Sequence, residues 1–262
     1  MQISLDQAPV GEALRLAAVM QCQLDVRLAR LGLHRGSLLH REDEEVVLAP
    51  VRILGPQGEA TLSAGMAAKV IVHHDDGHKT PIIEMLPGEA GHIEGLTSGA
   101  GLEAGLATLG LHENDRVQLL RKIPPMRYTA RLGQHRRVHF TESVAAKLWG
   151  ELNGRNVQFA NARRDHPFFV TAILGGKAAR EQIEALGIRP GSTLVLESIA
   201  PAQAVADLDG GDQERIVITS DDGLRLYLTR AQAAQVIVEI GGIGTQPPLG
   251  IGNEAATARP GD

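Results

Sequence analysis

The sequence LARLGLHRG at positions 28–36 returns twice in the chain, as LATLGLHEN at 106–114 and IEALGIRPG at 183–191. The central glycines, Gly32, Gly110 and Gly187, lie 78 and 77 residues apart. Self-similarity at a near-constant period is typical of chains built from repeated structural units. We therefore expect three modules that share one fold.

Each copy has the pattern of a short helix that ends in a tight turn and leads into a strand. In the first copy, Leu28 and Leu31 stand at helical spacing, and Gly32 follows where a helix commonly ends in a left-handed residue. Leu33 should then contact Leu28, which is the apolar contact of a Schellman ending. The Gly, Asn and Gly at positions 36, 114 and 191 suit a second positive φ in the turn.

The rest of each copy predicts a hairpin and a second short helix. The hairpins are expected at 51–62, 128–140 and 216–228. Each is followed by Ser or Thr and then by an Ala-Ala pair, and in the third copy Thr229 and Gln232 have the spacing of a capping box.

These alignments divide the chain into modules at residues 1–74, 81–152 and 155–240. The polar or Gly-bearing residues 75–80 and 150–156 are interpreted as linkers. Residues 241–262 are rich in Gly and Pro and are expected to be a disordered tail.

Composition narrows the classes of function. Hydrophobic residues make up 43% of the 262 residues but aromatic residues only 3%, so aliphatic cores are expected. The net charge of −5 lacks the basic footprint of a nucleic-acid-binding protein. No apolar run approaches the ~20 residues that cross a bilayer, and the first residues lack a signal-peptide pattern. With a single cysteine, Cys22, the chain is expected to be cytoplasmic and not embedded in a membrane.

Several motifs together resemble the ferrous iron transport protein A (FeoA) family. They are LPGEA at 86–90, the repeated Leu-Gly-Leu/Ile turn, the late hairpin and the final Ala-Ala helix. The resemblance implies a mainly β protein with short helices, arranged as three tandem SH3-like β-barrels. The same module occurs at the C-terminus of iron- and manganese-dependent repressors. The second copy departs from the family pattern at Asn114, and the third lacks the Gly-Glu pair of the first strand.

The resemblance also implies a function. FeoA-like modules act beside the membrane GTPase that moves ferrous iron and are not enzymes. We therefore expect a non-enzymatic protein-interaction or regulatory protein that contacts a protein partner, and the resemblance suggests the cytoplasmic part of such a transporter. The alternative is a divalent-metal-sensing regulator related to the repressor modules. The residues alone leave the partner and the oligomeric state open.

Two groups of residues are candidates for these functions. His73, His74, Asp76 and His78 have the side-chain types that bind Fe²⁺ or other divalent ions, but their spacing matches no established motif, and a solvated linker is the other interpretation. The turns of the three copies offer a partner surface or simply exposed polar residues. The partner-contact candidates are His34, Arg35, His112, Glu113 and Arg189.

An enzyme is not expected. There is no Gly-x-Ser-x-Gly elbow, and Cys22 has no activating neighbour in any motif. The glycines around Gly99 and Gly101 lack the Lys-Ser/Thr of a phosphate-binding P-loop and are interpreted as a loop. No cofactor is predicted.

Overall fold

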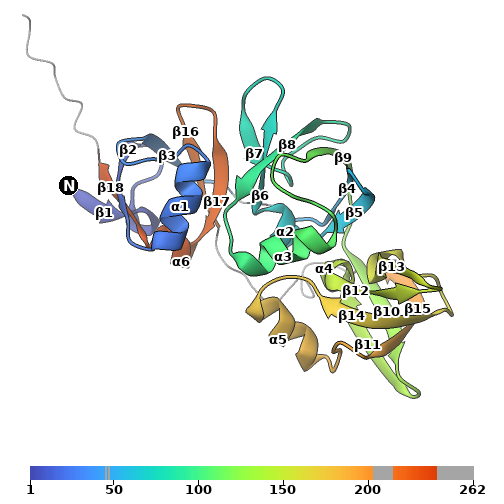
Figure 1. Ribbon diagram of the computed structural model, residues 1–262. Helices are drawn as coiled ribbons and strands as arrows, with labels where there is room; N and C mark the ends of the chain where they lie inside the picture. Colours follow the sequence, from blue (N-terminus) through green and yellow to red (C-terminus); the bar gives the residue numbers. More distant parts are fainter. Residues whose placement is uncertain (45, 47, 203–214, 241–262) are drawn as a thin grey trace, which may run out of the picture.

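A computed structural model describes residues 1–44, 46, 48–202 and 215–240. The protein is mainly β, with 46% strand and 21% helix, and contains three antiparallel sheets of six strands each. Figure 1 shows the three sheets side by side, with the second sheet between the other two. The tail predicted at 241–262 and most of the loop 203–214 lie outside the described residues.

The six strands of each sheet follow one another in space as follows. Sheet 1 contains β17 (Arg225–Thr229), β16 (Arg215–Ser220), β3 (Leu38–Glu42), β2 (Ala13–Val19), β18 (Val236–Ile240) and β1 (Gln2–Ser4). Sheet 2 contains β5 (Gly58–Leu62), β4 (Val51–Gly55), β9 (Arg116–Lys122), β8 (Ala90–Leu96), β6 (Val70–His74) and β7 (Lys79–Pro81). Sheet 3 contains β11 (Arg136–Thr141), β10 (Met126–Leu132), β15 (Thr193–Pro201), β14 (Pro167–Ile173), β12 (Leu148–Leu152) and β13 (Arg155–Gln158).

Eight short helices accompany these strands in the described part of the chain. In each sheet a longer helix connects the two central strands, and a shorter one follows the hairpin. The longer helices are α1 (Cys22–Arg30), α3 (Ala100–Thr108) and α5 (Lys177–Ala185). The shorter ones are α2 (Ala64–Ala67), α4 (Glu142–Lys147) and α6 (Arg230–Ala233), and two 3₁₀ turns are η1 (Leu5–Gln7) and η2 (Phe159–Asn161).

The predicted repeat is present in the fold, because the strand order is the same in all three sheets. The predicted hairpins form β4–β5, β10–β11 and β16–β17, and the capping box of Thr229 and Gln232 starts α6. The three central glycines have φ of +101°, +70° and +79°, as the sequence predicts. Leu33 and Leu28 share one apolar core, and the Leu33 N–H donates to the Leu28 carbonyl at 2.8 Å.

The sheets do not follow the boundaries 1–74, 81–152 and 155–240. Strand β9 of the second sequence copy pairs with β4 of the first, and β15 of the third copy pairs with β10 of the second. The first copy supplies β2 and β3, which pair with β18 and β16 near residue 240. Each sheet therefore combines the first half of one sequence copy with the second half of another. Sheet 1 is assembled from the two ends of the described chain.

The two segments interpreted as linkers are hairpin turns instead. Residues 75–78 connect β6 to β7, and Asn153 and Gly154 connect β12 to β13 with φ of +52° and +76°. Asn-Gly and Asp-Gly pairs are strong signals for tight hairpin turns, because these residues accept positive φ. The polar composition of both segments reflects this turn geometry.

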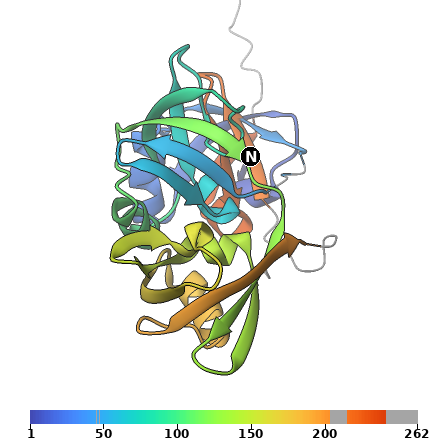
Figure 2. The same cartoon turned by 90° about the vertical axis from the view of Figure 1, so that its right-hand side faces the viewer.

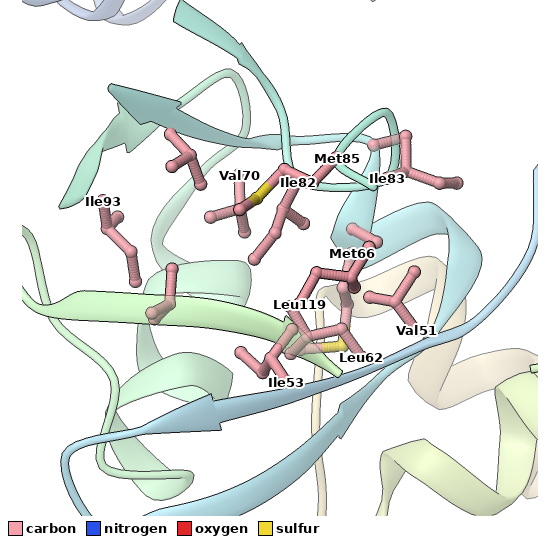
Figure 3. Packing of buried hydrophobic residues seen from close by; sticks show 14 of the residues in the cluster. Val51, Ile53, Leu62, Met66, Val70, Ile82, Ile83, Met85, Ile93 and Leu119 are labelled. Atoms are coloured by element: carbon pink, nitrogen blue, oxygen red, sulfur yellow. The ribbon is translucent and has the colours of Figure 1, made fainter. Parts of the chain in front are cut away.

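The three cores differ in composition. The core of sheet 2 consists almost entirely of aliphatic and methionine side chains, which in Figure 3 converge from β4, β5, β6 and α2 on one interior. The few aromatic residues gather in sheet 3, where Tyr128, Phe140, Phe159 and Phe168 contact one another with ring centroids 5.1–6.2 Å apart. The expectation of aliphatic cores is therefore wrong for this sheet.

Sheets 1 and 2 share side chains across their boundary. Ile71 of β6 is buried in the core of sheet 1, while Val217 and Tyr227 of sheet 1 are buried in the core of sheet 2. The Arg225 Nε donates to Glu84 Oε1 at 2.6 Å, and the Tyr227 hydroxyl donates to the same carboxylate. These contacts join the two sheets through both apolar and charged groups.

Sheets 2 and 3 are joined by one buried side chain. The Gln158 Nε2 donates to the carbonyls of Thr61 (2.7 Å) and Ala146 (2.6 Å), and its Oε1 accepts from the Thr61 N–H at 2.8 Å. Gln158 is only 2% exposed. From the side seen in Figure 2, sheet 3 lies below the other two.

We predict that Gly32→Ala lowers the melting temperature by a few degrees, corresponding to about 1–2 kcal/mol for a left-handed alanine. A Cβ at Gly32 would meet no atom within 4 Å, so backbone strain is the cause. The matched control is Gly65→Ala in α2, where the Cβ is also unobstructed and φ is not positive. It should leave the melting temperature unchanged or raise it. Equal melting temperatures for the two variants would contradict this account of the turn.

We also predict that Gln158→Leu destabilises the protein by about 2–3 kcal/mol, because it leaves the buried N–H and C=O of Thr61 unpaired. Thr61→Val is the control, because it keeps both backbone groups. The Thr61 hydroxyl is buried and has no hydrogen-bond partner among the described residues, so its loss should be neutral or favourable. Urea denaturation of the full chain measures both effects. A Gln158→Leu variant as stable as Thr61→Val would show that the bridge is dispensable.

Candidate functional site

The three turns after the longer helices have the same hydrogen-bond pattern. The N–H groups of Gly36, Asn114 and Gly191 donate to the carbonyls of β2, β8 and β14 at 2.7–2.8 Å. The φ angles of these residues are +96°, +69° and +92°. One residue later, a Ser or Asp side chain accepts from the first N–H of the turn; these pairs are Ser37 with His34, Asp115 with His112, and Ser192 with Arg189.

This pattern explains how the partner-contact candidates are held. The backbone of His34, His112 and Arg189 is fixed by the turn, while the side chains of all five candidates are exposed. The chain thus presents three rigid turns of similar shape with different side chains. Such an arrangement is able to bind a protein surface with little loss of conformational entropy.

The three turns do not form one continuous cluster. Glu113 lies 3.6 Å from Arg30 at the end of α1, so the second turn is next to the first helix. Between described residues, no hydrogen bond or ion pair connects the Arg189 turn to either of the others. A partner that contacts all three turns would have to extend over all three sheets.

The histidine candidates lie on the hairpin β6–β7. The rings of His74 and His78 stack with centroids 3.9 Å apart, and His74 Nε2 is 2.9 Å from Thr80 Oγ1. His78 is hydrogen bonded to Asp76. His73 is turned to another neighbour, and its Nδ1 is 3.5 Å from Glu94 Oε2. The hairpin therefore brings together His74, Asp76 and His78 but not His73.

Electrostatics favour a neutral imidazole at His74. Burial lowers the pKa of His74, and the neighbouring His78 lowers it further. On the same turn, two hydrogen bonds from Arg116 at 3.0 and 2.9 Å lower the pKa of Asp75. In the described part of the chain, no group of three or more His, Cys, Asp or Glu side chains has the arrangement to hold a metal ion.

The sequence interpretation missed one feature of the repeat. Gly99 does not lie in a loop but is the N-cap of α3, and Gly101 lies inside that helix. The equivalent helix α5 also begins after a glycine, Gly176. A lysine follows the Ala-Ala pair in the first two copies, as Lys69 and Lys147, and the third copy has Gln235 there. Alignment of the copies would have shown this pairing of lysine with a glycine-capped helix.

No family model, no curated protein and no solved structure matches this chain. Among the described residues, none of the helices has the length and apolar character needed to span a bilayer.

Proposed function

We propose that this chain is a non-enzymatic protein-interaction protein associated with ferrous iron transport or iron homeostasis. The observation that carries the proposal is the set of three equivalent turns, each held by the same hydrogen bonds and each with exposed side chains. Rigid exposed turns on repeated modules are suited to binding an extended partner surface. The connection to iron rests on the sequence motifs similar to the FeoA family.

The finer fold belongs to the same proposal. In the described residues the edge strands of each sheet are not paired with each other, so hydrogen bonding does not close a barrel. Register shifts interrupt equivalent pairs, including β4–β9, β10–β15 and β6–β8. Such bulges bend strands and increase their twist. We therefore assign each sheet an SH3-like form, in which bent strands wrap around one core while the edges remain open.

The partner that best fits the proposal is the cytoplasmic part of a ferrous iron transporter GTPase. This places the protein in the cytoplasm. His34 and His112 occupy the same position in two turns, where an exposed imidazole is able to donate and accept hydrogen bonds. Arg35, Glu113 and Arg189 add charges that would select the partner surface.

The double variant His34→Ala/His112→Ala is predicted to weaken binding to the transporter's cytoplasmic region by about tenfold or more, as expected for the loss of two interface hydrogen bonds. Binding is measured by biolayer interferometry with the purified region. The control, His135→Ala/His139→Ala, removes two exposed histidines of sheet 3 outside the turns and should bind normally. Absence of binding by the unmodified chain would refute the partner, and normal binding by the turn variant would refute the surface.

The second candidate function is a sensor of divalent metal ions. The stacked rings of His74 and His78, together with Asp76, are the observation that favours it. Ligation would need further oxygen or nitrogen ligands, such as water, because these three side chains do not complete a coordination sphere.

Calorimetric titration with Fe²⁺ under anaerobic conditions, and with Mn²⁺ and Zn²⁺, tests the sensor function. If the protein is a sensor, His74→Ala/His78→Ala should abolish the heat of binding, whereas His34→Ala/His112→Ala should retain it, because these residues lie on other turns. No heat with any of the three ions excludes the sensor function and leaves the protein-interaction function unaffected.

A further inference from the structure

A cavity of about 310 Å³ lies between sheets 2 and 3, at the starts of α3 and α5. The charged side chains that line it are all lysines, namely Lys69, Lys147 and Lys177. No Asp or Glu is among its described lining residues. The cavity is therefore strongly cationic, in a chain whose net charge is −5.

Two equivalent parts of the repeat face each other across this cavity. The carbonyl of Lys69 accepts from Thr97 N–H at 3.0 Å, just before α3, and the carbonyl of Lys147 accepts from Leu174 N–H at 2.7 Å, just before α5. Each lysine is thus held beside the start of a nine-residue helix. In sheet 1 the same bond is made by Gln235, so the third copy has no lysine there.

The helix starts add to the positive potential. Their N-cap residues are Gly99 and Gly176, which have no side chain to accept hydrogen bonds from the first turn. A Cβ on Gly101 would lie 2.7 Å from the Gly176 Cα, so the two helix starts are in contact. Two positive helix ends placed together are unfavourable unless an anion lies between them.

The cations around Lys69 are incompletely compensated. Burial lowers the pKa of Lys69, and the nearby charges of Arg215 and Lys147 lower it further. In addition, the Nε and Nη1 atoms of Arg215 are buried without a hydrogen-bond partner among the described residues. Buried polar atoms of this kind are normally satisfied by a partner, a water molecule or an ion.

We propose that this cavity binds a phosphate group, either as inorganic phosphate or as the phosphate of a small ester. Lysine ammonium groups and backbone N–H groups of helix starts are the donors that proteins use for phosphate. The glycines allow an oxyanion to approach the backbone closely. Met66 and Leu102 form an apolar part of the wall, which would contact the organic portion of an ester. The site is separate from the turns of the proposed function.

Isothermal titration calorimetry with inorganic phosphate and with glycerol phosphate tests the proposal on the full chain. Binding is expected at ligand concentrations of about 1 mM or below. Tighter binding of glycerol phosphate would show that the apolar wall contributes, and equal affinities would show recognition of the phosphate group alone. Absence of binding by both ligands would overturn the proposal.

The matched variants separate binding from folding. Lys69→Gln/Lys147→Gln gives both lysine positions the side chain found at Gln235, and should weaken phosphate binding by about tenfold or more. Its melting temperature without ligand should stay the same or rise, because repulsion between cations is removed. Lys122→Gln removes an exposed lysine elsewhere and should bind like the unmodified protein. Unchanged phosphate affinity in the double variant would assign the binding to another place.

Discussion

The insertion of β18 between β1 and β2 is the interaction on which the architecture depends. Glu239 pairs with Gln2 on one side and with Arg15 on the other, so the backbone of one strand joins the two ends of the described chain. Sheet 1 has no other source for its second half, and its strands pair residues as far apart in sequence as Leu14 and Ile240. Contacts of such long range carry a large loop-closure entropy and slow the folding of a β protein. Sheets 2 and 3 are built from contiguous stretches and do not share this requirement.

Most local structure could be predicted from the sequence because it depends on single residues with narrow conformational preferences. Gly32 and its equivalents fix the helix ends, and the three hairpins follow from alternation of apolar residues. Asp165 shows where the pattern is hidden: it has φ +62° and its N–H donates to the Leu196 carbonyl, as Gly11 and Gly88 donate to their neighbouring strands. The third copy therefore keeps the geometry of the lost Gly-Glu pair with a residue that tolerates positive φ less well.

The pairing between halves could not be predicted from local pattern. The strands β3, β9 and β15 are equivalent, and so are β4, β10 and β16, so alternation of side chains allows several combinations. What selects among them is contact between modules, such as the Gln158 amide at Thr61 and the shared side chains Ile71 and Val217. The same limit applies to the candidate residues. Exposure of His34 and Arg189 follows from turn polarity, whereas the meeting of Lys69 with Lys147 needs the arrangement of two sheets.

The divided origin of sheet 1 has a consequence for association between molecules. If β16–β18 separate from β1–β3, the chain has two complementary strand edges, one near each end of the described residues. The edges of one molecule then fit those of the next in the same sense, which is a heterologous contact that forms rings or linear filaments instead of a closed dimer. Within one molecule the high effective concentration of the two edges favours intramolecular closure. The balance between monomer and filament is therefore controlled by protein concentration and by any condition that opens sheet 1.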